Sequence, residues 1–399
     1  MHFTQRIPVL SLTVFLSFAA AAQGTAKKER ARDLGIPLDG TPGPLDAITD
    51  VAGVEVGFTT LISGGGKLKV GVGPVRTGVT AVLPRGKASR DAVFAGWFSQ
   101  NGNGEMTGTT WVEESGFLSG PVMITNTHSV GTVRDGVIAW QVSRDRTPLM
   151  VPSDFFWSLP VVAETWDGGL NDVNGFHVKE PHVFAALDAA KGGAVPEGNL
   201  GGGTGMICYG FKGGTGTASR IVPRKGGTAN DTVGVLVQCN CGRRSQLTIA
   251  GAPVGKEIPQ AKTADAAPAR RRDEDVGSII IVVATDAPLL PQQLKRLTRR
   301  ATMGLARTGS TSGNGSGDIF IAFSTANPGA GKETGTSQVT MLANDDLNPI
   351  FAATVEATEE AIVNAMLGAE TMTGANGLTV EALPHERLRE VLRKYGRGP

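Results

Sequence analysis

The chain has 399 residues, a formal net charge of +1 and a hydrophobic fraction of 40%. This length allows one large domain or two small ones, and the apolar fraction suffices for a substantial core. The near-neutral charge gives no electrostatic footprint for nucleic acid, and the 55 glycines follow no collagen-like period. We therefore expect a globular protein with many tight turns between short strands.

The first 22 residues are typical of a signal peptide. Arg6 precedes an apolar stretch at 7–19, and the alanines at 20–22 fit a small-residue cleavage site. The apolar stretch is short for a membrane-spanning helix, although an uncleaved anchor is the alternative. We expect a mature protein that begins near Gln23, is periplasmic or secreted, and has no membrane contact after signal removal.

Short β-type runs broken by glycine and proline follow, from Leu34 to about Gly86. Helical periodicity appears twice further along the chain. The expected strands before residue 257 are 51–58, 79–83, 122–125, 206–211, 233–238 and 247–249, and the expected helices are 131–143 and 181–190.

The sequence has three cysteines, Cys208, Cys239 and Cys241. Cys239 and Cys241 are two residues apart in a strand-like stretch, so their side chains should point to the same face. A disulfide from Cys208 to one of them is one interpretation, but we favour the other, three small buried apolar side chains. In an oxidising compartment an odd count leaves at least one thiol free or intermolecular.

Residues 258–276 differ in composition from the segments around them. This stretch is rich in alanine, proline and alternating charge and nearly lacks large apolar residues, which predicts an exposed linker. The run at 278–284 that follows it is continuous, apolar and β-branched, as in a strand buried on both faces. A second such strand is expected at 318–323, and helices are expected at 291–307, 348–367 and 383–395. Helices beside buried strands predict layered α and β structure.

The Gly277–Ser278 pair stands where the linker meets the first buried strand. Glycine has no Cβ, so a neighbouring serine hydroxyl can approach its carbonyl and convert the amide to an ester. Hydrolysis of the ester would leave Ser278 with a free α-amine, whose ordinary pKa of about 7.7–8.0 suits a general base. One residue could then supply nucleophile and base together, although many Gly-Ser pairs simply begin strands.

Sequence blocks from about Ala31 to Leu392 resemble the family of L-aminopeptidase/D-esterases, D-aminopeptidases and β-peptidyl aminopeptidases. Their number and order make a chance match untenable. The matching blocks are LGIPLDGTPGPLDAITDVAGVEVG, NGNGEMTGTTWVEESG, PVVAETWDGGLNDVNG, GGGTGMICYGFKGGTGTASR, VGVLVQCNCGRR, DVGSIIIVVATDAPL and GNGSGDIFIAFST.

The resemblance implies self-cleavage between Gly277 and Ser278. The products would be an α chain at 23–277 and a β chain at 278–399 of one catalytic domain. It also implies a four-layer αββα sandwich that resembles N-terminal nucleophile hydrolases with different strand connections. Members of the family form oligomers of αβ units, act on small peptides or amino-acid amides and esters, and need no cofactor or metal.

The same resemblance assigns the catalytic residues. Ser278 matches the nucleophile, and Ser316 and Asp318 match the serine and acidic residue that complete a triad with it. Residues two apart on a strand face the same side, so a hydroxyl there can relay a proton while the carboxylate orients it. Asn240 matches an oxyanion-hole asparagine and should point away from the flanking cysteines.

Two further positions match substrate-binding residues of the family. Glu164 matches the carboxylate that receives the free amine of the substrate, as an aminopeptidase requires. Trp166 stands where some relatives carry tyrosine, and its indole can donate a hydrogen bond but not accept one. This substitution leaves the preferred substrate open.

Three functions compete on this sequence. The first is an aminopeptidase that releases small L-, D- or β-amino acids. The second is an acyltransferase of the ornithine acetyltransferase type on the same fold, although those enzymes use threonine at the cleavage site. The third is a non-catalytic binding relative. Against it stands the joint presence of all five matched site residues, Ser278, Ser316, Asp318, Asn240 and Glu164.

Overall fold

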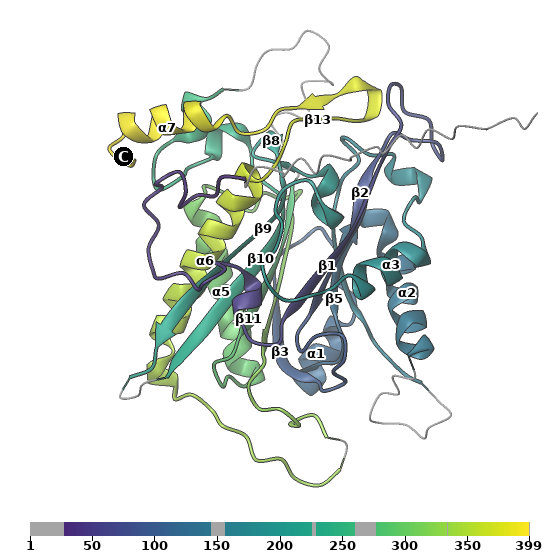
Figure 1. Ribbon diagram of the computed structural model, residues 1–399, viewed down its shortest axis with the longest axis vertical. Coiled ribbons are helices and arrows are strands. Elements are labelled where there is room, and N and C mark those ends of the chain that lie inside the picture. The colour runs from purple at the N-terminus through teal and green to yellow at the C-terminus, as the bar shows by residue number, and fades with distance from the viewer. Residues whose placement is uncertain (1–27, 145–155, 226–228, 260–276, 333, 399) are drawn as a thin grey trace, which may run out of the picture.

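The computed structural model describes residues 28–144, 156–225, 229–259, 277–332 and 334–398. The expected signal peptide lies outside the described residues, as does the linker segment 260–276. Within the described ranges, no helix is long and apolar enough to cross a bilayer. The described chain forms two sheets stacked between pairs of helices (Figure 1).

The first sheet has four strands in the order β1-β2-β5-β6. β2 pairs antiparallel with both β1 and β5, whereas β5 and β6 run parallel. The strands of this sheet are β1 (Glu55–Ser63), β2 (Val75–Leu83), β5 (Val122–Asn126) and β6 (Val161–Thr165).

The second sheet has six strands in the order β4-β3-β12-β11-β10-β9. Its central strands β11 and β12 run parallel, and the other neighbours are antiparallel. Its strands are β3 (Val93–Gly102), β4 (Phe117–Leu118), β9 (Gly214–Pro223), β10 (Asn230–Asn240), β11 (Ser278–Thr285) and β12 (Gly317–Ser324). Two short pairs lie outside both sheets: β7 (Ile207–Cys208) with β8 (Phe211–Lys212), and β13 (Met372–Thr373) with β14 (Thr379–Val380).

Helices cover the outer face of each sheet. α2 and α3 pack on the first sheet, and α5 and α6 pack on the second (Figure 1). The helices are α1 (Thr109–Ser115), α2 (Val130–Ser143), α3 (Glu180–Asp188), α4 (Val254–Glu257), α5 (Pro291–Arg307), α6 (Asn348–Leu367) and α7 (His385–Lys394). The order helix, sheet, sheet, helix confirms the four-layer αββα sandwich.

β11 is buried on both faces, as its continuous apolar sequence predicts. Ile279 and Ile281 pack toward α5 and α6, whereas Ile280 and Val282 pack between the two sheets. Side chains alternate between the two faces of a strand, so Ser278, two residues before Ile280, points to the same face as Ile280. The Ser278 side chain therefore lies between the two sheets.

Most predicted elements are confirmed. The predicted helices at 291–307 and 348–367 coincide with α5 and α6, and those at 131–143 and 181–190 correspond to α2 and α3. Two predicted strands are wrong. The segment 206–211 is split into β7 and β8 by a turn at Tyr209 and Gly210, which have φ values of +51° and +69°. The segment 247–249 forms only an isolated bridge from Ile249 to Ala252.

The strands β3, β6 and β9 were not predicted. β9 reads GTGTASRIVP and lacks the apolar alternation of a strand. Its glycine content follows from packing, because a Cβ on Gly216 would lie 2.1 Å from the carbonyl oxygen of Ala361 in α6. Glycine therefore allows α6 to lie directly on this strand.

The three cysteines lie together on the helix side of the second sheet. Cys208 and Cys239 form a disulfide, and the sulfur of Cys241 lies 3.8 Å from that of Cys239. The prediction that Cys239 and Cys241 share a face is confirmed. The favoured interpretation of three unlinked apolar side chains is wrong, because Cys208 is bonded to Cys239.

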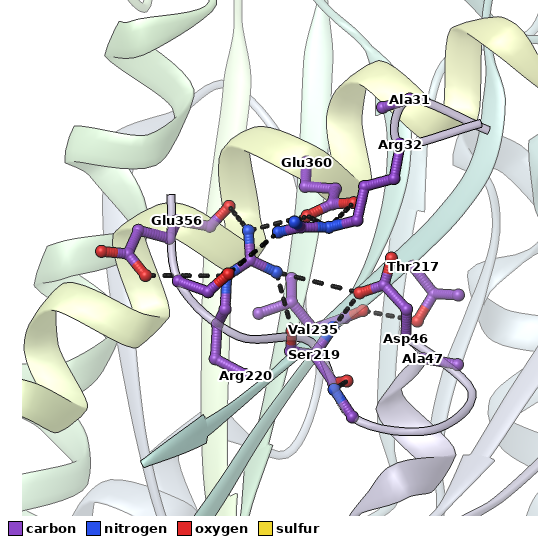
Figure 2. A network of polar contacts seen from close by, with 12 residues as sticks. Ala31, Arg32, Asp46, Ala47, Thr217, Ser219, Arg220, Val235, Glu356 and Glu360 are labelled. Carbon is purple, nitrogen blue, oxygen red and sulfur yellow. Dashed lines mark hydrogen bonds and ion pairs between the residues drawn. The ribbon is translucent and has the colours of Figure 1, made fainter. Parts of the chain in front are cut away.

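A network of buried charges joins the N-terminal segment of the described chain to β9 and α6 (Figure 2). Arg220 is the most deeply buried cation of this network, and its guanidinium lies 2.7 Å from the carboxylate of Glu360. The network contains three guanidiniums and four carboxylates, those of Arg30, Arg32, Arg220, Asp46, Glu197, Glu356 and Glu360.

Candidate active site

Three neighbouring strands bring the predicted catalytic residues to one edge of the second sheet. Asn240, the last residue of β10, lies opposite Ser278, the first residue of β11. Ser278 in turn lies beside Gly317, the first residue of β12. Because β11 and β12 are parallel, their first residues meet at the same edge, which gathers Asn240, Ser278 and the 316–318 segment.

The backbone N–H of Gly317 contacts both groups that self-cleavage would use. It donates to the carbonyl oxygen of Gly277 at 3.1 Å and to Oγ of Ser278 at 3.2 Å. A Cβ on Gly277 would lie 2.4 Å from the backbone oxygen of Asn240 and 2.5 Å from Cα of Cys241. The peptide bond before Ser278 therefore fits its surroundings only with glycine on its N-terminal side.

Ser316 and Asp318 form a buried pair on either side of Gly317. The Ser316 hydroxyl donates to Oδ1 of Asp318 at 2.7 Å. Asn101 of β3 holds this segment from the other side, since its Nδ2 donates to the backbone oxygen of Ser316 at 2.6 Å. The predicted serine and acidic residue are thus in contact, and they flank the residue whose N–H reaches Ser278.

The Asn240 side chain is held by its oxygen. Oδ1 accepts a hydrogen bond of 2.8 Å from the backbone N–H of Ile207 in β7. Because the oxygen is engaged there, the amide N–H groups are directed away from β7 and can serve as donors. Cys239 and Cys241 belong to the core on the helix side, which confirms the prediction that Asn240 and the thiols face opposite ways.

Glu164 approaches this edge from the first sheet, at β6. Its carboxylate is buried and accepts hydrogen bonds from the backbone N–H of Glu105, at 3.1 Å, and from the Thr127 hydroxyl. Burial raises the pKa of the Glu164 carboxyl, and these two donors partly oppose that effect. Among the described residues it forms no ion pair with lysine or arginine.

Gly104 links Glu164 to the nucleophile edge. A Cβ at this position would lie 3.1 Å from Oε1 of Glu164 and equally close to Cα of Gly317. Gly104 therefore packs against both the Glu164 carboxylate and Gly317, which brings this carboxylate close to the segment whose N–H reaches Ser278. This spacing suits a small amine bound at Glu164 with its carbonyl near Ser278.

Trp166 lies two residues after Glu164, and its side chain is 39% exposed. The indole rests on Gly168, where a Cβ would lie 2.6 Å from the ring. The tryptophan is therefore a surface residue two positions after the carboxylate in the chain.

Several residues of this site were not singled out from the sequence. The site uses the backbone N–H of Gly317, the hydroxyl of Thr127, and the absence of a side chain at Gly104, which lets Glu164 and Gly317 lie close to it. None of these features has a sequence signature. Two of the three residues lie within the blocks NGNGEMTG and GNGSGD, whose glycine and asparagine content was the available signal.

Comparisons with known proteins identify the family of this chain. The profile of peptidase family S58 matches residues 46–380. The chain belongs to this family. A family member from Sphingosinicella microcystinivorans, the β-peptidyl aminopeptidase BapA, is 54% identical over 100% of this chain and 99% of its own length.

Solved structures of the family have the same fold. The L-aminopeptidase D-Ala-esterase/amidase of Ochrobactrum anthropi, described as a prototype of the serine aminopeptidases and a variant of the Ntn hydrolase fold, superposes with a TM-score of 0.83. It is 50% identical, and the match covers 93% of this chain and 99% of that one. A β-aminopeptidase of Burkholderia sp. is 45% identical with a TM-score of 0.81, over 93% of this chain and 100% of its own.

Family membership and these relatives make the chain a serine aminopeptidase of the N-terminal nucleophile type. They favour this function over the acyltransferase and over a non-catalytic relative. The residues that carry the reaction, the cleavage and the preferred substrate follow from the geometry as proposals.

Proposed function

We propose that the chain cleaves itself between Gly277 and Ser278 and then releases small N-terminal residues through an acyl-enzyme on Ser278. The observation that carries this proposal is Glu164, a buried carboxylate without a lysine or arginine partner in the described chain, which lies with Gly317 against Gly104. An ammonium group of a substrate would supply the missing positive charge.

Self-cleavage begins with attack of the Ser278 oxygen on the carbonyl carbon of Gly277. The Gly317 N–H, 3.1 Å from that carbonyl oxygen, stabilises the negative charge that develops there. The C–N bond then breaks, and the proton of the hydroxyl ends on the departing nitrogen. Water hydrolyses the resulting ester, which leaves a carboxyl on Gly277 and a free α-amine on Ser278.

Turnover reuses the same groups. Glu164 binds the ammonium of the substrate, and the α-amine of Ser278 takes the proton of its own hydroxyl as the oxygen attacks the substrate carbonyl. The Asn240 amide and the Gly317 N–H donate to the oxyanion. The leaving amine takes the proton, and water then hydrolyses the ester. Ser316 and Asp318 orient the α-amine from the segment beside it.

The substrate class follows from the site and its relatives. Glu164 demands a free N-terminal amine, and the names of the relatives indicate β-peptides, L-amino-acid peptides and D-alanine esters or amides. Trp166 borders the entrance and would limit which peptides fit beyond the first residue. We further propose that the mature enzyme is periplasmic or secreted and assembles as an oligomer of αβ units.

A denaturing gel of the purified protein tests the cleavage. We expect two bands, and N-terminal sequencing of the smaller one should read Ser-Ile-Ile-Ile-Val-Val. Ser278→Ala should remain one full-length band without activity. Hydrolysis of L-, D- and β-alanyl p-nitroanilides then ranks the substrates. A persistent single band with no hydrolysis of any of the three would refute the proposal.

A further inference from the structure

We infer that Lys212 is a positioning residue for the reaction, which acts on Asn240 through the peptide group between Met206 and Ile207. The inference rests on the oxyanion role proposed above for Asn240. It assigns a function to a buried lysine that belongs neither to the nucleophile nor to the amine-binding carboxylate.

Lys212, the last residue of β8, is fully buried. Its Nζ donates to the backbone oxygen of Met206 at 2.9 Å and to that of Gly213 at 2.8 Å. In the described chain it forms no ion pair with a carboxylate, and burial lowers its pKa to about 7. A buried ammonium held only by carbonyls is costly, because two neutral dipoles replace its hydration shell. Such a residue calls for an explanation beyond packing.

The carbonyl that Lys212 holds belongs to the peptide group that orients Asn240. The oxygen of this group, on Met206, accepts the hydrogen bond from Lys212, and its N–H, on Ile207, donates to Oδ1 of Asn240 at 2.8 Å. A continuous chain of hydrogen bonds therefore runs from the Lys212 ammonium through one backbone amide and one side-chain amide. It ends on the Asn240 N–H groups.

In its protonated form, Lys212 places a cation at the start of this chain, and that charge strengthens each donor along it. Charge on the carbonyl side of an amide draws electron density from its nitrogen, so its N–H becomes a better donor. The same effect then acts on Asn240, whose amide oxygen accepts that N–H. Lys212 fixes the orientation of this peptide group together with the Gly213 N–H, which also donates to the Met206 oxygen at 2.9 Å, and its charge increases the capacity of the Asn240 amide to stabilise negative charge on the substrate oxygen.

The surrounding links hold the two segments in register, so the role left to Lys212 is orientation and charge. Ile207 pairs with Lys212 across the β7–β8 hairpin. The disulfide from Cys208 to Cys239 joins the residues directly after Ile207 and before Asn240. The backbone N–H of Tyr209 also donates to the oxygen of Cys241 at 2.7 Å.

Lys87 provides a matched control elsewhere in the fold. Its Nζ likewise donates to two backbone oxygens, those of Asp188 at 2.7 Å and Ala190 at 2.8 Å. These carbonyls lie at the C-terminal end of α3, against the outer face of the first sheet. Lys87→Met removes the same number of hydrogen bonds without affecting the hydrogen-bond chain that ends on Asn240.

A double-mutant cycle with Lys212→Met and Asn240→Ala tests the inference, with kcat and KM measured per cleaved enzyme on the best alanyl p-nitroanilide. We expect Lys212→Met to lower kcat about tenfold with KM unchanged, and Asn240→Ala to lower it about 100-fold. The double variant should be no slower than Asn240→Ala, because Lys212 acts through that residue. Lys87→Met should leave kcat unchanged.

The outcomes separate the two proposals. Wild-type kcat in Asn240→Ala would overturn the oxyanion role itself. If Asn240→Ala is slow, two results would overturn the role of Lys212 only. The first is that the losses in kcat add in the double variant, and the second is that Lys212→Met raises KM alone. If Lys212→Met fails to unfold cooperatively or to cleave, Lys212→Gln, which keeps an N–H donor without the charge, enters the same cycle.

Discussion

Two regions of this molecule bury carboxylates, and they do so in opposite ways. In the charge network of Figure 2, Arg220 and Arg32 both contact Glu360. At the active edge, Glu164 is also buried, and among the described residues its carboxylate accepts only from a hydroxyl and a backbone N–H. The first arrangement neutralises charge within the fold, and the second is the one that we propose a substrate ammonium completes. A buried carboxylate without a lysine or arginine partner thus indicates a ligand-binding function.

The largest effect is expected from breaking the network. Arg220→Met leaves Glu360 and Asp46 without their shared guanidinium, which should lower the free energy of unfolding by about 3–5 kcal/mol. Urea unfolding of the processed protein measures this loss. Lys394→Met, which removes an exposed partner of Glu257, is the control and should change stability little. Equal effects of the two variants would contradict the structural role of the network.

The complementary change acts on the unpaired carboxylate. Glu164→Gln removes the charge and keeps one acceptor oxygen, and the Thr127 hydroxyl can turn to accept from the new amide N–H, so kcat/KM should fall roughly 100-fold, about 2.7 kcal/mol, with stability retained. Glu360→Gln is the matched control, because it should lower stability and leave kcat/KM of the folded enzyme unchanged. If Glu164→Gln instead lowers stability and spares kcat/KM, the two regions do not differ as described here.

A smaller effect is expected at the cleavage site. Gly277→Ala places a methyl group against backbone atoms of Asn240 and Cys241, so the scissile carbonyl must move from the Gly317 N–H. We expect self-cleavage to slow about tenfold, followed on a gel as loss of the full-length band. Enzyme that has already been cleaved should turn over at the wild-type rate, since Gly277 then ends the other chain. Unchanged cleavage would show that this contact is not used.

The smallest effect concerns the proton that the network retains. Burial and the nearby charge of Glu360 raise the pKa of Asp46 to about 7, in a cluster with one carboxylate in excess. The folded state then holds a proton that the unfolded chain releases above pH ~4, so this group makes stability fall as pH rises from about 4 to about 7. The decrease in melting temperature between pH 5 and pH 8 should be smaller in Asp46→Asn. A parallel decrease in both proteins would assign the proton elsewhere.

The sequence by itself determined the elements that carry a strong local signal. The helices α5 and α6 and the buried strands β11 and β12 were found close to their observed bounds, because helical periodicity and continuous β-branched runs are local signals. Family resemblance added the positions of Ser278, Ser316, Asp318, Asn240 and Glu164. It did so without any account of how they meet.

Only the tertiary structure decided what surrounds those residues. β9 exists because β10 and α6 cover a glycine-rich segment that has no strand pattern of its own. The contact of the Gly317 N–H with Ser278 and the link from Lys212 to Asn240 each depend on residues far apart in the chain. The same is true of the surroundings of Glu164, which contain no lysine or arginine partner among the described residues. Backbone donors and buried charges acquire their roles from what lies beside them, and that proximity is set by the packing of the two sheets.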